Sequence, residues 1–178
     1  GHEPAGIIDK VGRNVKHIKE GDKVAIYLAI GCGHCKYCYQ GTLHLCNNWE
    51  CLGFTVDGGN AEYCVVPSRN ALKVPDNMSY NEAAFSTDKF GTLYSAAKKL
   101  NVSGSGTIGV FGMGPMGVSG VVVCKNMGAQ VVAVDIDKAR REFAKSLGAD
   151  HVLNPTDKSF IDQVMSITND NGFDYAMD

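Results

Sequence analysis

The first part of the chain has the hydrophobic pattern of β-structure. Short apolar segments such as AGII, KVAIYLAI and ALKV are separated by turns rich in Gly, Pro and Asp, which is typical of strands and hairpins. Residues 4–28 are expected to form β-hairpin structure. We expect a further strand at residues 61–66, which Pro67 ends, and no helix before residue 78. This part is therefore predicted to be an all-β unit.

The periodicity changes at Ser79, which begins a helical segment. Ser79 and Glu82 have the spacing of a capping box, in which each side chain bonds the other residue's backbone N–H. The pattern predicts a helix from there to about Leu100, with Gly91 as a weak point. This helix is expected to bridge two domains.

From Thr107 onwards, apolar strands alternate with helical patterns. Gly128 and Gly148 stand where the first two helices should end. All-apolar strands that alternate with helices indicate a parallel sheet covered on both faces, as in part of a doubly wound α/β fold. The predicted strands are 107–112, 129–135, 151–154 and 173–177, and the predicted helices are 115–128, 137–148 and 157–167. We place the domains at 1–77 and 78–178.

Composition narrows the function classes. The 178 residues are 44% hydrophobic, enough for a core, and 17 Lys+Arg against 19 Asp+Glu give a net charge of -2. No basic run suits a nucleic acid, and no apolar run reaches the length of a membrane span or resembles a signal. We expect a cytoplasmic protein. The chain starts without Met and ends in an expected strand, so we interpret it as part of a longer protein.

Four of the seven cysteines stand in one short segment with the spacing C-x2-C-x2-C-x7-C. Four thiolates suit zinc and close a tetrahedral shell, which leaves no position for a substrate, so this zinc would be structural. Gly31, Gly33 and Gly41 would let the backbone wrap around an ion. Two disulfides or free buried thiols are the alternatives. The cysteines are Cys32, Cys35, Cys38 and Cys46.

A G-x-G-x-x-G sequence lies between an expected strand and an expected helix. The first glycine permits the tight turn, the second lets the backbone approach a pyrophosphate, and the third lets helix and strand pack closely. The free N–H groups of the helix start would hold the phosphates. The candidate cofactor-binding residues here are Gly112, Gly114, Pro115, Met116 and Gly117.

The next expected strand ends at Asp135, close to the position at which dinucleotide-binding proteins carry an acid for the adenosine ribose. A carboxylate there accepts from the ribose hydroxyls and repels a 2′-phosphate, so the pattern predicts NAD rather than NADP. Asp135 could instead cap the following helix, but Asp137 suits that role better. Arg140, one turn further on, is expected to flank the adenosine or to be a solvated surface charge.

The segments GHEPAGII, DGGNAEY, VFGMGPMG and VVAVDIDK, together with the cysteine loop and in this order, resemble the zinc-dependent medium-chain dehydrogenases, the alcohol and polyol dehydrogenase family. The resemblance covers essentially the whole chain. It implies a partial all-β GroES-like domain with the structural zinc loop, a partial Rossmann domain, and an active-site zinc in the cleft between them.

The resemblance also implies residues for that catalytic zinc. His2 matches the family's zinc histidine, and Glu3 matches a nearby glutamate that can approach the metal. Asp88 falls at a ligand position on the bridging helix, four residues before Thr92, which would face the cofactor. Asp88 could otherwise be an exposed acid beside Lys89.

The chain departs from the family at one ligand. The family's first catalytic ligand, usually a Cys followed by a Ser or Thr that relays the proton, precedes the GHE motif and is not in this sequence. Cys51, Cys64 and Cys124 are no substitutes, because we expect them in a loop, a strand and a Rossmann helix as ordinary buried thiols.

The resemblance implies an NAD-dependent zinc alcohol dehydrogenase that exchanges a hydride between an alcohol or polyol and NAD, with a small-molecule substrate and a homo-oligomeric state, dimer or tetramer. Two alternatives remain. One is a zinc-free, quinone-reductase-like enzyme of the same superfamily, which normally lacks the cysteine loop and the GHE histidine. The other is a non-catalytic NAD-binding or zinc-stabilised interaction protein.

Overall fold

The computed structural model describes all residues from 1 to 178. The chain forms two compact units, Gly1–Asp88 and Lys89–Asp178. The division falls inside the helical run that starts after Ser79, a little later than the boundary expected after residue 77. None of the helices combines the length and apolar character needed to cross a membrane.

The first unit is built on small antiparallel sheets. The predicted hairpin is confirmed, because Ala5 on the first strand lies opposite Ala25 on the second. A third strand, β5, pairs with the other side of β2, and two short strands pair separately. The strands are β1 (Ala5–Ile7), β2 (Lys23–Ile26), β3 (Ala29–Ile30), β4 (Glu50–Cys51) and β5 (Ala71–Lys73). Val24 and Ile26 of β2 and Ala71 of β5, with Ile18 and Leu52, form the core of this unit.

The strand expected at residues 61–66 is not present. The segment forms no ladder with any strand, and Tyr63 and Val65 are 73% and 98% exposed. Cys64 and Val66 do face the core, so the alternation of apolar residues indicated which side chains point inward. Alternation does not supply a neighbouring strand, and without one an extended segment has no ladder hydrogen bonds.

Two smaller expectations for this unit were also wrong. Cys51 lies in strand β4 rather than in a loop. The part before residue 78 is not free of helix, because the cysteine loop contains one helical turn, α1 (Lys36–Tyr39). Residues three apart lie on one face of a helical turn, so α1 brings the side chain of its N-cap, Cys35, next to that of Cys38.

The helical run after Ser79 has three parts. The capping box is confirmed, because Ser79 N donates to Glu82 Oε2 at 2.7 Å and Glu82 N donates to Ser79 Oγ at 3.2 Å. Helix α2 (Tyr80–Phe85) is followed by a π-helical turn (Ser86–Phe90) and then by α3 (Gly91–Lys99). The weak point expected at Gly91 is therefore a π-helical turn that ends just before it.

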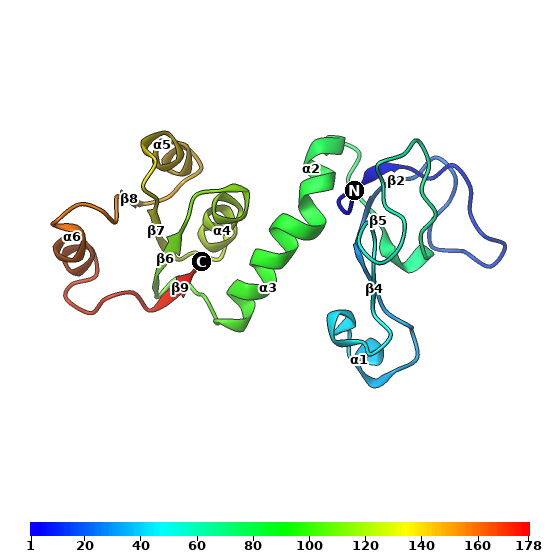
Figure 1. Cartoon of the computed structure of the whole chain (residues 1–178), viewed down its shortest axis with the longest axis horizontal. Helices are drawn as coiled ribbons and strands as arrows, with labels where there is room; N and C mark the ends of the chain where they lie inside the picture. The colour runs from blue at the N-terminus through cyan, green and yellow to red at the C-terminus, as the bar shows by residue number, and fades with distance from the viewer. The chain divides into compact units, whose positions relative to one another are not determined.

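The second unit is the predicted parallel sheet, with strand order β8-β7-β6-β9. Figure 1 shows β6 between β7 and β9. The helix ends expected at Gly128 and Gly148 are confirmed, since both glycines have positive φ just beyond α4 and α5. The elements are β6 (Thr107–Phe111), α4 (Pro115–Asn126), β7 (Gln130–Val134), α5 (Lys138–Ser146), β8 (His151–Leu153), α6 (Phe160–Ile167) and β9 (Tyr175–Met177).

Both faces of this sheet are buried. Val131 and Ala133 of β7 pack with side chains of α3, α4 and α5 on one face. Val132 and Val134 pack with α6 on the other. The chain runs outward from β6 through β7 to β8 and then returns to the opposite side of β6 for β9. In such sheets, ligands bind at the carboxyl ends of the strands where the order reverses, which here is the end of β6.

Candidate functional site

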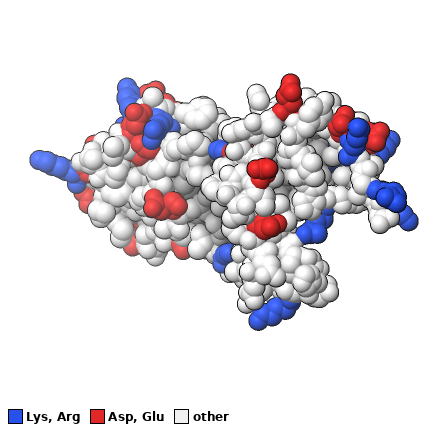
Figure 2. Space-filling model, turned by 45° about the vertical axis from the view of Figure 1, so that its right-hand side comes forward, with Lys and Arg blue, Asp and Glu red and all other residues white.

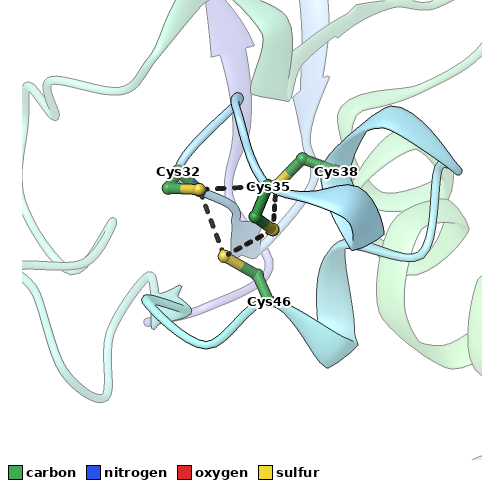
Figure 3. A group of neighbouring side chains, drawn as sticks. All are labelled: Cys32, Cys35, Cys38 and Cys46. Carbon is green, nitrogen blue, oxygen red and sulfur yellow. Dashed lines mark hydrogen bonds between the residues drawn. The ribbon is translucent and has the colours of Figure 1, made fainter.

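Four cysteine side chains converge in the loop around α1 (Figure 3), and their ligand sulfurs all lie within 4.8 Å of one another. The Sγ atoms of Cys32 and Cys38 are 3.9 Å apart, those of Cys35 and Cys38 3.6 Å, and those of Cys35 and Cys46 3.8 Å. A tetrahedron with zinc–sulfur bonds of about 2.3 Å has edges of about 3.8 Å. A disulfide needs about 2.05 Å. The spacing therefore fits a four-thiolate zinc site and not two disulfides.

Glycines give this loop its close turns. A Cβ on Gly31 would lie 2.7 Å from Cys38 Sγ, so a side chain at position 31 would push on the sulfur cluster. Gly33 and Gly41 have φ values of +85° and +75°, which side chains disfavour. Arg69 Nη2 donates to the carbonyl of Gly31 and fixes the entrance of the loop.

Charge in the cluster also suits a cation. The backbone N–H of His34 lowers the pKa of Cys32, and that of Cys38 lowers the pKa of Cys35 to about 6. The N–H of Gly33 acts in the same direction on Cys38, but burial and the neighbouring sulfurs together raise that pKa to about 11. Thiolates this close repel one another, and a divalent cation relieves that repulsion.

A second group of ligand atoms is formed by His2, Glu3 and Asp88, which lie within 4.8 Å of one another. His2 Nε2 is 3.2 Å from Asp88 Oδ2, and both side chains are about a third or less exposed, 33% and 26%. Nitrogen and oxygen ligands about 2.1 Å from zinc stand about 3.4 Å apart in a tetrahedron. Three protein ligands leave a fourth position open, so this group can hold a metal that also binds a small molecule.

The glycines of the DGG turn pack against the residues around His2. The N–H of Gly59 donates to the carbonyl of Gly1 at 2.7 Å. A Cβ on Gly58 would lie 2.5 Å from that carbonyl, and a Cβ on Gly53 would lie 2.9 Å from the same residue. The loop that carries these glycines also supplies Phe54, whose ring centroid is 4.9 Å from that of His2. The DGG sequence thus fixes the backbone that presents His2.

Asp88 reaches this group from the π-helical turn, and its charge acts on two neighbours. Burial first, and then Asp88, raise the pKa of Tyr27 and of Cys51. Burial alone raises the pKa of Cys64 and of Cys124, a fully buried residue of α4. None of these three cysteines belongs to either ligand group.

The glycine turn between β6 and α4 has the geometry of a phosphate cradle. Gly112 has a φ of +81° and opens the turn. A Cβ on Gly117 would lie 1.8 Å from the Gly112 carbonyl, so only glycine fits there. Gly114 is the N-cap of α4, with Pro115 following it, and a Cβ there would meet nothing within 4 Å. The start of α4 therefore has open space over its free N–H groups, as a pyrophosphate requires. Met116 in its first turn is 40% exposed.

Asp135 lies beside this turn, with its side chain only 5% exposed. Its Oδ2 accepts from Met113 N at 2.6 Å and its Oδ1 from Asp137 N at 2.7 Å. The N–H of Asp137 is the largest cause that lowers the pKa of Asp135. Asp137 caps α5 by accepting from Arg140 N, as expected. Arg140 Nη1 is 4.0 Å from Asp135 Oδ2.

The remaining predicted residue, Thr92, is exposed in the first turn of α3, and its role toward a cofactor stays a prediction. Sequence reasoning did not single out Phe54, the N–H of Met113, or Arg141, which donates to the Asp135 carbonyl. Met113 lies between two glycines of the G-x-G-x-x-G motif, but nothing in the motif indicates a role for its N–H, and Phe54 lies outside the segments that the motifs cover.

Comparison with known proteins agrees with this geometry. Residues 1–76 match the family model of the alcohol dehydrogenase GroES-like domain, and residues 115–178 match that of the zinc-binding dehydrogenases. The chain is 43% identical over 156 residues to an alcohol dehydrogenase of Geobacillus stearothermophilus, an alignment that covers 87% of this chain and 46% of that protein.

Solved structures are also similar. A crystal structure of an NAD-dependent alcohol dehydrogenase superposes with a TM-score of 0.93 at 31% identity, over 99% of this chain and 52% of that one. The alcohol dehydrogenase TADH from Thermus sp. ATN1 gives 0.91 at 32% identity, over 99% and 53%. The chain belongs to the zinc-dependent medium-chain dehydrogenase family. It spans about half the length of the relatives that it matches.

Proposed function

We propose that the protein that carries this chain is an NAD-dependent zinc alcohol dehydrogenase, which exchanges a hydride between an alcohol or polyol and NAD. The observation that carries this proposal is the open group of His2, Glu3 and Asp88, present in a chain that also has a dinucleotide-type glycine turn. The four-cysteine group alone would support only a structural role, because its shell is closed.

The two metal groups differ in charge as well as in openness. Four thiolates around Zn²⁺ would give a net charge of −2, which makes the ion a poor Lewis acid. His2 and the Asp88 carboxylate, with the ligand that precedes the GHE motif in the family, would hold the ion and leave a position open, which Glu3 can approach. When bound, zinc in the second group would supply Lewis acidity to an alcohol oxygen, and NAD would accept the hydride.

The residues of the chain would hold these components in place. His2 and Asp88 would fix the position of the metal, and Phe54 would limit the rotation of the His2 ring through its contact at 4.9 Å. Gly112, Gly114 and Gly117 would admit the pyrophosphate. Asp135 would accept from the adenosine ribose, since each carboxylate oxygen that receives one backbone N–H keeps a further lone pair.

The finer properties of the whole protein are proposals on the resemblance alone. We propose a homo-oligomer, dimer or tetramer, in the cytoplasm, that acts on a small-molecule alcohol and has no nucleic-acid partner. Figure 2 shows basic and acidic side chains mixed with uncharged ones on the face in view. The molar mass in solution, measured by light scattering, tests the oligomeric state.

The activity is tested by NADH formation with a panel of primary alcohols, secondary alcohols and polyols. We expect alcohol-dependent reduction of NAD that falls at least about 100-fold in His2→Ala, and a clear preference for NAD over NADP that Asp135→Ala removes. NAD binding without turnover of any alcohol would favour a non-catalytic NAD-binding protein. An unchanged preference in Asp135→Ala would contradict the assigned role of this carboxylate.

A further inference from the structure

We propose that Arg141 is a positioning residue that sets the preference for NAD over NADP, by fixing the peptide that carries the Asp135 carboxylate. The inference rests on the proposed NAD function and names a residue outside the motifs that carried it. Arg141 acts through the backbone and would not touch the cofactor.

The contacts that support this lie just beyond the end of β7. Arg141 Nη1 donates to the carbonyl of Asp135 at 2.7 Å and to that of Ile136 at 2.9 Å. The parallel ladder with β6 ends at Val134, so these two carbonyls lie beyond the pairing that holds the rest of the strand. The N–H of Asp135 still bonds the Leu153 carbonyl at 3.2 Å. The guanidinium therefore fixes the peptide at the point where the sheet stops doing so.

The position of Arg141 on α5 makes this contact natural. It is the fourth residue of the helix, and helical side chains lean toward the helix N-terminus. Asp137 caps the same helix through the N–H of Arg140. The turn from β7 to α5 is thus held at both ends, by the cap on one side and by the half-buried Arg141 on the other.

The fixed peptide determines where the carboxylate points. Asp135 Oδ2 accepts a hydrogen bond from the Met113 N–H of the glycine turn, and Oδ1 accepts one from the Asp137 N–H. A ribose diol needs the remaining lone pairs of these oxygens in a set direction, and a charge-assisted bond is sensitive to that direction. The charges of Arg140 and Arg141 add to the N–H of Asp137 in keeping the pKa of Asp135 low.

Arg140 differs from Arg141 in the way it would act. Its guanidinium is 61% exposed and lies 4.0 Å from Asp135 Oδ2, so it would flank the adenosine directly. If the peptide at 135–136 loosens, the carboxylate can turn away while Arg140 stays available to a 2′-phosphate. Loss of Arg141 should therefore weaken NADH binding and leave NADPH binding unchanged or stronger.

The test is a fluorescence titration of the chain with NADH and with NADPH. In Arg141→Met, we expect the dissociation constant for NADH to rise about 5- to 10-fold, because two hydrogen bonds from a charged group are lost. That for NADPH should stay within about 2-fold. Arg141→Lys keeps a donor, so its dissociation constant for NADH should lie between those of the parent and of Arg141→Met. Lys138→Met is the charge control, since Lys138 is on the same helix, 82% exposed, and pairs only with Glu142 at the surface.

The outcomes separate the inference from the function on which it rests. Equal weakening of NADH and NADPH in Arg141→Met would mean general loosening of the unit and would overturn the inference, as would no change in either. If Arg141→Met does not fold, Arg141→Lys must still lower the ratio of NADPH to NADH dissociation constants. A parent chain that binds NADPH as well as NADH, or neither, would overturn the proposed function and this inference together.

Discussion

Asp150 joins three elements of the second unit through its side chain and its carbonyl. It stands just before β8, and both its carboxylate oxygens accept hydrogen bonds from Lys125 Nζ of α4, at 2.9 and 2.8 Å. Its Oδ2 also accepts from Val131 N of β7 at 2.7 Å, while Lys145 of α5 donates to its carbonyl. Partial burial would raise the pKa of Asp150, but Lys125 and the Val131 N–H hold it below its usual value.

The ion pair predicts a pH dependence. A carboxyl whose pKa is lowered by folding stabilises the fold above its unfolded-state pKa of about 3.9, and this stabilisation is lost as the pH falls through the folded-state pKa. We expect Lys125→Met to cost about 1 kcal/mol at pH 7. The difference from the parent should shrink between about pH 5 and pH 3. Urea unfolding followed by circular dichroism measures it.

The exposed pair of Lys138 and Glu142 is the control for this measurement, because at 82% and 67% exposure it contributes little. Lys138→Met should follow the parent at every pH. If the difference between Lys125→Met and the parent does not change with pH, Asp150 does not carry the stabilisation.

At the residue scale, the sequence predicted the capping roles well because they depend on near neighbours. Ser79, Glu82 and Asp137 bond backbone groups within three residues. Arg141 and Phe54 could not be predicted in the same way. Their contacts depend on how a strand end meets a helix or how a loop meets the chain around His2. No local sequence pattern determines either arrangement.

At the element scale, the glycine turn separates two reasons for a glycine. Position 117 is crowded by the chain itself, and position 114 faces open space. The motif predicted the close packing at Gly117, because it has a fixed relation to a strand and a helix. The approach of a pyrophosphate at Gly114 stays a prediction. The strand expected at residues 61–66 was wrong because pairing depends on a partner far along the chain.

This difference predicts opposite effects for two similar substitutions. Gly117→Ala should destabilise the unit by about 3 kcal/mol, because its Cβ would overlap the Gly112 carbonyl. Gly114→Ala should lower the stability by less than about 1 kcal/mol. It should still weaken NADH binding at least about 10-fold, since the methyl group would occupy the pyrophosphate space. Thermal unfolding and NADH titration measure the two effects. A Gly114→Ala protein that binds NADH like the parent would argue against a pyrophosphate at this turn.

The cysteine loop predicts a similar test. Gly31→Ala places a Cβ 2.7 Å from Cys38 Sγ and should weaken zinc binding about tenfold. Gly12→Ala is the control, because its Cβ meets only Val15 at an ordinary 3.7 Å. Competition with a chromophoric chelator measures the affinity. Equal zinc affinity in the two variants would show that the loop is not tightly closed around the metal.

At the scale of the whole molecule, the chain contains two ligand groups of different character. The cysteine group is close in sequence, so its spacing alone indicated a metal. His2 and Asp88 are 86 residues apart, and only the family resemblance connected them. The sequence did not predict the π-helical turn that presents Asp88 or the glycines that pack against Gly1, because these features depend on tertiary contacts and not on periodicity.

We propose that the protein that carries this chain has one closed and one open zinc site. Elemental analysis of the reduced, zinc-loaded protein that carries this chain, and of its His2→Ala/Asp88→Ala double variant, gives the number of bound zinc ions. We expect close to two zinc ions per chain and close to one in the double variant, matching the two ligand groups. One zinc ion in both proteins would contradict the open site, and no zinc in either would contradict both.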